Sequence, residues 1–142
     1  MIGHCRCTNV KVEWQFDRAS EVHPVICGCE YCTAHNAQYV FQADTVVEIH
    51  IREFSFYRQI QQGTKTAVFH ECLSCGMLVC VTVDSGGQVY GAINRDCFPE
   101  KLVFATPLRV DHDGAPIQDR IKKWEQNWCS SVTINSGWIA GH

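Results

Sequence analysis

Apolar and polar side chains alternate along most of this chain in short runs that turn residues separate. The clearest run, residues 10–16, alternates at every position and predicts a β-strand with one buried face. Runs of the same kind predict further strands at residues 21–26, 38–42, 46–51, 54–58, 66–70, 78–83 and 89–93. Glycines in segments 61–64 and 84–87 predict hairpin connections, because glycine readily adopts positive φ. The pattern predicts a mainly β, antiparallel fold.

One short helix is expected near the C-terminal end of the chain, over residues 115–129. Its apolar stripe consists of four residues at helical spacing, Ile117, Ile121, Trp124 and Trp128. Pro116 stands where a first helical turn tolerates proline. We interpret the stripe as a surface that packs on the core. No linker, repeat or low-complexity segment divides the sequence, so residues 1–142 are expected to form a single domain.

Composition and charge exclude several classes of protein. A hydrophobic fraction of 46% is too high for a disordered segment. The net charge is −3 and the lysines and arginines are scattered, so we do not expect a nucleic-acid partner. No run of apolar residues is long enough for a membrane span, and residues 1–5 do not resemble a secretory signal. We expect a cytoplasmic protein that acts on small molecules; the sequence does not predict its oligomeric state.

Ten cysteines are the most informative feature of the sequence. In a secreted chain they could form disulfides, whereas in a cytosolic chain clustered cysteines indicate metal binding or catalysis. A bridge between Cys5 and Cys7, or between Cys27 and Cys29, would close a strained ring, because disulfides require specific Cα separations. Metal binding is therefore the better interpretation of these clusters.

Seven of the cysteines divide into a group of four and a group of three. We pair two distant segments as a closed structural zinc site, which we call the cysteine quartet: Cys5, Cys7, Cys72 and Cys75. The remaining group, the cysteine trio, is local in sequence: Cys27, Cys29 and Cys32. Tetrahedral zinc with Zn–S bonds of about 2.3 Å needs sulfurs roughly 3.8 Å apart, which both groups can provide. Three protein ligands and one exchangeable position are typical of catalytic zinc, so two zinc ions per chain are expected.

The number of thiolates in each group predicts different chemistry. Four thiolates saturate zinc, whereas three leave a position for a water molecule or a substrate thiol. Thiolate ligands weaken zinc as a Lewis acid, which favours a bound substrate thiolate over attack by water. Such a thiolate would attack an aldehyde carbon, and a nearby acid would protonate the new alkoxide. His35 and His70 are candidates for that acid because they lie near the cysteine clusters in the sequence.

Three motifs together resemble a known family. They are Gly-His-Cys-Arg-Cys at residues 3–7, Cys-Gly-Cys-Glu-Tyr-Cys at 27–32 and Phe-His-Glu-Cys-Leu-Ser-Cys-Gly at 69–76. In order and spacing, over about residues 3–98, they resemble the glutathione-dependent formaldehyde-activating enzyme family, which includes the centromere protein V group. The sequence departs from the family at Gly28, where the family often has histidine, and beyond residue 98.

The resemblance implies a mainly β, Mss4-like fold stabilised by zinc. It implies a structural zinc at the cysteine quartet and a catalytic zinc at the cysteine trio. The family activity is that of a carbon–sulfur lyase, S-(hydroxymethyl)glutathione synthase, which condenses formaldehyde reversibly with glutathione. The resemblance therefore implies a small-molecule thiol and an aldehyde as substrates.

Other interpretations of the same residues stay open. Cys80, Cys97 or a histidine could close the trio, which would make both zinc sites structural and the protein a non-catalytic interaction module. A dithiol redox protein is a third interpretation, but the βαβ pattern typical of that class is missing. Cys80 and Cys129 are expected to be small buried hydrophobic residues.

Two histidines and two arginines also allow alternative roles. His70 could orient the quartet, because it precedes Cys72 by two residues and would share its face of a strand. For His35 a surface position is the alternative. Arg58 and Arg95 could pair with the carboxylates of glutathione, although ordinary surface roles are expected for both.

Overall fold

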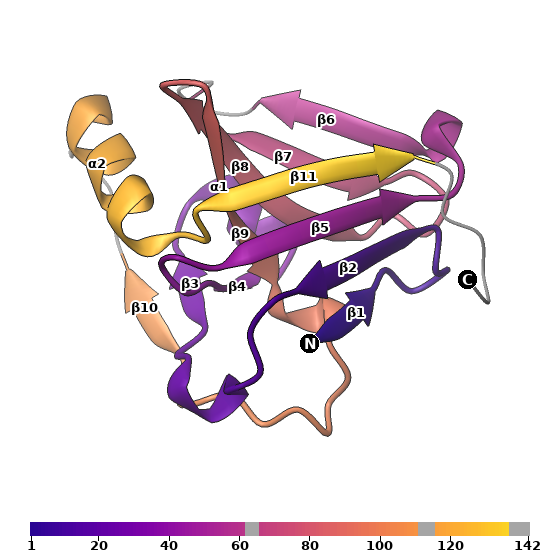
Figure 1. Cartoon of the computed structure of the whole chain (residues 1–142), viewed down its shortest axis with the longest axis horizontal. Coiled ribbons are helices and arrows are strands. Elements are labelled where there is room, and N and C mark those ends of the chain that lie inside the picture. Colours follow the sequence, from indigo (N-terminus) through magenta and orange to yellow (C-terminus); the bar gives the residue numbers. More distant parts are fainter. Residues whose placement is uncertain (62–65, 111–115, 137–142) are drawn as a thin grey trace.

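The computed structural model describes residues 1–61, 66–110 and 116–136, and within them the strands form two sheets (Figure 1). The smaller sheet has the order β1-β2-β5-β11, with bounds Ile2–His4, Val10–Trp14, Val46–Ile51 and Ser131–Ser136. The larger sheet has the order β10-β3-β4-β9-β8-β7-β6. In that order its strands are Leu108–Val110, Val25–Cys27, Gln38–Val40, Gln88–Asn94, Leu78–Ser85, Val68–Cys72 and Tyr57–Gln61. The expected mainly β fold is confirmed.

Most neighbouring strands in the described part of the chain are antiparallel, but two pairs there are parallel. Strand β10 pairs in parallel with β3, and β11 pairs in parallel with β5. The hairpin expected at residues 84–87 joins β8 to β9, and Gly86 and Gly87 have φ angles of 63° and 83°. The hairpin expected at 61–64 falls almost entirely outside the described residues.

Several predicted strands differ from the observed ones in their bounds. The strands predicted at 10–16 and 38–42 end early, at Trp14 and Val40, and the strand predicted at 66–70 is shifted to Val68–Cys72. The segment predicted at 21–26 begins with a 3₁₀ turn, Ala19–Glu21, and only Val25–Cys27 is a strand. Pro24 lies between them and has no N–H for a sheet hydrogen bond. The segment predicted at 54–58 likewise begins with a 3₁₀ turn, Phe54–Phe56, and its strand starts at Tyr57.

Two apolar clusters form the core. One lies between the sheets and includes Trp14, Ile49 and Ile93. The other covers the outer face of the larger sheet and includes Phe69 and Trp128. Alternation along β2 explains the first cluster, since its residues are alternately buried and half-buried. The larger sheet is therefore buried on both faces, which accounts for the uninterrupted burial of residues 78–83 in β8.

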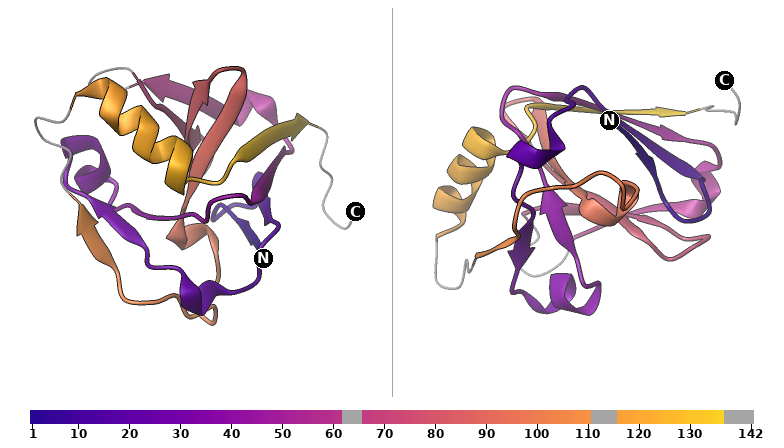
Figure 2. Two further views of the ribbon diagram at one scale, coloured as in Figure 1. Left: turned by 60° about the vertical axis from the view of Figure 1, so that its left-hand side comes forward. Right: turned by 90° about the horizontal axis from the view of Figure 1, so that it is seen from below.

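Within the described residues, two α-helices lie outside the sheets, α1 (Glu30–Ala34) and α2 (Ile117–Asn127), as Figure 2 shows. The expected C-terminal helix is thus present, but β11 follows it. The expected apolar stripe packs only at its end: Trp124 and Trp128 stack with ring centroids 4.8 Å apart, whereas Ile117 is 41% exposed. Among the described residues, no helix has the length and apolar character that crossing a membrane requires.

Candidate metal centres

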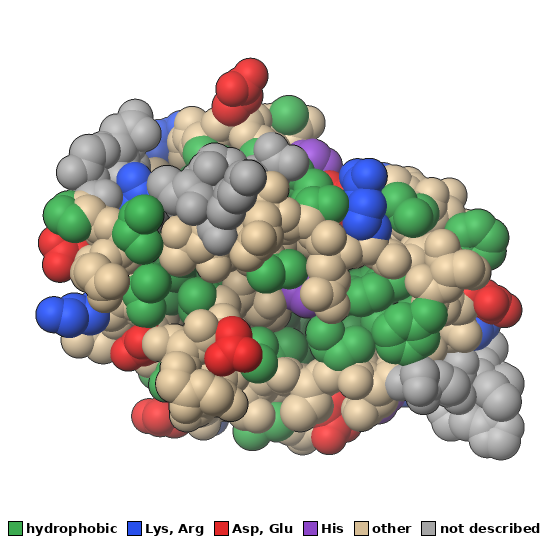
Figure 3. All heavy atoms as spheres, turned by 90° about the horizontal axis from the view of Figure 1, so that it is seen from above, with side chains coloured by type: hydrophobic (Ala, Val, Ile, Leu, Met, Phe, Trp, Pro, Cys, Tyr) green, Lys and Arg blue, Asp and Glu red, His purple; other side chains and the backbone are tan. Residues whose placement is uncertain are grey.

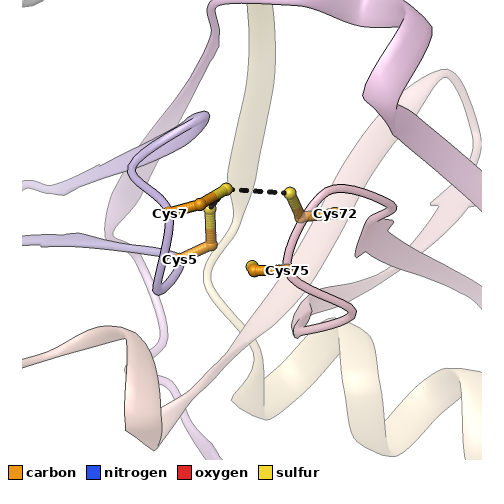
Figure 4. Close-up of side chains that lie close together, drawn as sticks. All are labelled: Cys5, Cys7, Cys72 and Cys75. Atoms are coloured by element: carbon orange, nitrogen blue, oxygen red, sulfur yellow. Dashed lines mark hydrogen bonds between the residues drawn. The ribbon is translucent and has the colours of Figure 1, made fainter.

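Two loops from different sheets bring the cysteine quartet together (Figure 4). Cys5 and Cys7 lie in the loop from β1 to β2, and Cys72 and Cys75 lie at the turn from β7 to β8. All four sulfurs lie within 4.8 Å of one another. The Cys5–Cys7 and Cys7–Cys72 separations are 3.7 Å and 3.5 Å, close to the spacing around a tetrahedral metal ion with thiolate ligands. The residues present therefore fit a metal ion.

Backbone hydrogen bonds shape both loops. In the first, the Cys5 N–H donates to Val10 O over 2.9 Å, and the Val10 N–H lies 3.3 Å from the Cys5 sulfur. In the second, the Gly76 N–H donates to Cys72 O over 2.8 Å, and Gly76 has a φ of 74°. Glycine adopts this angle without strain, so the chain can turn back directly after Cys75. Each loop therefore presents two sulfurs to the same point.

The quartet thiols have unequal acidity. Burial raises the pKa of Cys5 to about 12. Burial alone would also raise the pKa of Cys7, but hydrogen bonds to its sulfur from the Asn9 backbone, Ser74 and the neighbouring thiols lower it to about 6. Burial raises the pKa of Cys72 as well. The Cys5 and Cys72 thiols are therefore costly to ionise without a cation, which a bound metal ion would supply.

The cysteine trio surrounds the start of α1. Cys27 ends β3, Cys29 caps α1, and Cys32 lies within the helix. The Cys32 N–H donates to the Cys29 sulfur over 3.4 Å, so Cys29 takes the usual place of a serine or aspartate cap. The three sulfurs lie within 4.8 Å of one another. Cys29 is exposed, Cys27 is half-buried and Cys32 is buried, so the group has one side in solvent and one side in the core.

Among the described residues, no further cysteine, histidine or carboxylate joins the trio within that distance. Cys80 and Cys97, the cysteines considered as a fourth ligand, lie instead in the cluster between the sheets. The Cys97 thiol donates to Val79 O over 3.6 Å. Cys129 is also fully buried there, as expected for a small hydrophobic residue. Within this part of the chain, the division into four and three is therefore the one that the structure shows.

A buried tyrosine contacts the trio. The Tyr39 hydroxyl oxygen lies 3.1 Å from the Cys32 sulfur, and Tyr39 is only 5% exposed. The hydrogen bond between the Cys27 and Cys32 thiols, followed by burial, raises the pKa of Cys32, and burial raises the pKa of Tyr39. The sequence did not indicate this contact. In the sequence, Tyr39 has the pattern of an ordinary strand residue. Only the pairing of β4 with β3 brings it beside the trio.

Neither candidate histidine belongs to a sulfur cluster in the described structure. His70 is buried and bonded to Tyr57 on one ring nitrogen and to Thr82 on the other, and burial lowers its pKa to about 4. It therefore does not orient the quartet as one interpretation had it, and its interactions lie within the core. His35 lies 2.9 Å from Tyr31 O through Nδ1, at the end of α1.

A buried carboxylate, Glu71, joins α1 to the larger sheet. Tyr31 donates a hydrogen bond to Glu71, Arg58 binds the same carboxylate over 2.5 Å and 3.2 Å, and His35 lies 3.4 Å from it. Burial alone would raise the pKa of Glu71, but the hydrogen bonds from Tyr31 and Arg58 lower it. Glu71 directly precedes Cys72, so this network connects the trio to the strand that supplies the quartet.

Both arginines considered for glutathione carboxylates have partners within the protein. Arg58 binds Glu71. Arg95 donates to the carbonyl oxygens of Phe98 and Leu102 and lies 4.7 Å from the centroid of the Phe104 ring. An ordinary surface role was expected for both; Arg58 is exposed, whereas Arg95 is half-buried.

Comparisons with known proteins add little to this geometry. No protein-family model matches the chain, and no curated protein matches it. One solved structure, a structural-genomics target protein from Rhodobacter sphaeroides, is 21% identical, with a TM-score of 0.49. The match covers 84% of this chain and 94% of that one. Any functional conclusion must therefore rest on the residues of the two sulfur clusters.

Proposed function

We propose that the protein is a zinc-dependent carbon–sulfur lyase of the formaldehyde-activating type, with an Mss4-like fold. In this proposal it adds a glutathione-like thiol reversibly to a small aldehyde such as formaldehyde. One observation carries the proposal: within the described residues, one sulfur cluster has four cysteines and the other has three. A metal ion in the first would be enclosed, whereas a metal ion in the second would keep a position for an exchangeable ligand.

The donor atoms favour zinc at both clusters. Thiolates select soft or borderline metals, and a tetrahedral set of four sulfurs is typical of structural zinc. Zinc at the trio would hold the substrate thiol as its thiolate and would accept that thiolate again when the carbon–sulfur bond breaks. The free thiols of the chain suit a reducing compartment, so we propose a cytoplasmic location.

The protein residues around the trio support access from solvent. Cys29 is exposed, and no atom lies within 4 Å of the point where a Cβ on Gly28 would be. A thiol of peptide size can therefore approach this side without meeting a side chain at position 28. Because the approach is open to water, solvent can protonate the alkoxide that forms when the thiolate adds to the aldehyde. The reverse reaction returns that proton to water.

A non-catalytic interaction module with the same fold is the second candidate. Three exposed apolar side chains favour it, Phe54, Phe56 and Leu73, which are 46%, 49% and 47% exposed. They lie together at the turn that follows Cys72, where the Leu73 N–H donates to Phe56 O over 2.7 Å. In that function the quartet would stabilise a binding surface, and the trio would be a second structural site.

Single cysteine substitutions separate these candidates. We expect the wild-type protein to bind two zinc ions per chain. Cys29→Ala should bind one, keep its far-ultraviolet circular dichroism and lose the acceleration of thiol–aldehyde addition. Cys72→Ala should lose the fold, because structural zinc binding is coupled to folding. Metal content is measured by atomic absorption, and exchange between ¹³C-formaldehyde and its glutathione adduct by NMR.

Cys129→Ala is the matched control, since Cys129 is buried outside both clusters. It should retain two zinc ions and full activity. If the fully loaded wild-type protein does not accelerate exchange with glutathione or with other small thiols, the lyase proposal is wrong and the interaction module is favoured.

A further inference from the structure

A buried tyrosine, Tyr39, lies on the side of the trio that faces the core. Tyr39 belongs to β4, between Val25 of β3 and Asn94 of β9, and its ring packs in the outer core cluster. Its hydroxyl oxygen lies 3.1 Å from the Cys32 sulfur, within the range of a hydrogen bond to sulfur. Cys32 is 3% exposed and Tyr39 is 5% exposed, so water does not compete freely for this contact.

The direction of this hydrogen bond follows from the state of the two groups. A tyrosine hydroxyl is protonated at neutral pH and can donate its hydrogen. A cysteine that binds a metal ion does so as a thiolate, which can only accept a hydrogen bond. In the metal-bound protein Tyr39 must therefore be the donor and the Cys32 sulfur the acceptor.

We propose that Tyr39 is a positioning residue of the trio, whose hydroxyl hydrogen-bonds the Cys32 thiolate and reduces the charge that this sulfur donates to the metal ion. The inference rests on the proposed metal site at the trio. Three thiolates make a metal ion a weak Lewis acid, and a hydrogen bond to one of them partly reverses that effect. The bond also fixes Cys32 on the buried side, so the exchangeable position is directed away from Tyr39, toward the exposed Cys29.

Tyr57 provides a matched control for Tyr39. It is also a buried tyrosine on the larger sheet, burial raises its pKa, and its hydroxyl is bonded to His70. Its strand, β6, lies at the opposite edge of the sheet from β3, which carries Cys27. Tyr57→Phe therefore removes a comparable buried hydrogen bond without touching the trio.

The test uses the full chain loaded with cobalt(II), whose thiolate charge-transfer absorption reports on the sulfur ligands. Tyr39→Phe should weaken metal binding at the trio about 10- to 100-fold in chelator competition. It should also move the charge-transfer band to lower energy, because the thiolate loses a hydrogen bond. Tyr57→Phe should change neither quantity at the trio, and Tyr39→Phe should leave the affinity of the quartet unchanged.

A second variant covers the case in which Tyr39→Phe does not fold. Fluorotyrosine at position 39 keeps the shape of the ring and makes the hydroxyl a stronger donor, so the band should move to higher energy. If the trio band and affinity of Tyr39→Phe equal those of Tyr57→Phe, or if fluorotyrosine leaves the band unmoved, the inference is wrong while the lyase proposal stands. If the wild-type trio binds no metal ion, both are wrong.

Discussion

Gly3 lies two residues before Cys5 and leaves no space for a side chain. A Cβ at this position would lie 2.5 Å from the carbonyl oxygen of Cys97 and 2.9 Å from a ring carbon of Phe98. The first of these atoms belongs to the backbone and cannot move aside by a change of rotamer. Only glycine therefore allows β1 to pass this segment, and β1 leads directly to Cys5.

Gly3→Ala should lower the free energy of unfolding by about 1–3 kcal/mol, the usual cost of an overpacked core. Gly28→Ala is the control, since an added Cβ there meets no atom within 4 Å. Its effect should stay within about 0.5 kcal/mol. Urea denaturation at saturating zinc measures both changes. Equal stability of the two variants would contradict the assigned contact.

The clusters of cysteines could be predicted at the residue scale, but their neighbours could not. A metal ion requires several thiolates at short range, so the spacing of Cys5, Cys7 and the others in the sequence was informative. Tyr39 and Glu71 carry no such signal, because a tyrosine in a strand is an ordinary core residue. Their positions depend on strand pairing, which local patterns do not specify.

The element that carries the trio, α1, has only five residues and buries only Cys32. A helix of this length is unstable without tertiary contacts. Tyr31 supplies two: its hydroxyl donates to Glu71, and its ring centroid lies 4.2 Å from that of Phe69. Tyr31 therefore helps to hold the trio in position.

Tyr31→Phe should increase hydrogen exchange of the α1 amides while leaving β7 and β8 protected. The ring contact remains, but a hydrogen bond to a charged group, worth about 1.5–3 kcal/mol, is lost. Mass spectrometry of peptic fragments measures the exchange. Tyr90→Phe is the control, because no hydrogen bond of the Tyr90 hydroxyl is present within the described residues. Unchanged exchange in α1 would show that Glu71 does not anchor it.

At the scale of elements, the sequence predicted where strands occur better than it predicted which strands pair with each other. Strand β5 has the predicted bounds, since every second residue is buried. The parallel pairing of β11 with β5 was missed, because α2 intervenes and alternation within a strand does not identify its neighbour. Strands β1 and β10 were also missed, since three residues are too few for a periodic pattern.

In the whole molecule, the quartet connects the two sheets. One pair of its cysteines follows β1 of the smaller sheet, and the other pair follows β7 of the larger one. The trio, in contrast, lies within the larger sheet and its helix. A metal ion bound at the quartet would therefore stabilise the packing of one sheet on the other, whereas a metal ion bound at the trio would affect only local structure. On the face in Figure 3, acidic and basic side chains are scattered among the described residues rather than gathered in one stripe.

The three thiols outside both clusters report on unfolding of the core, because a reagent can reach them only when the core opens. Burial raises the pKa of Cys80, Cys97 and Cys129, so each resists alkylation until the core opens. In iodoacetamide and a mild chelator, the mass of the chain should first increase by three adducts, one on each cysteine of the trio. The number of adducts should then rise to ten, one on every cysteine, when the two sheets separate. Intermediate masses with Cys80 labelled beside Cys29 would show instead that the core opens whenever the trio does. Counting adducts would therefore distinguish loss of a metal ion bound at the trio from unfolding of the whole chain, with no dye or tag.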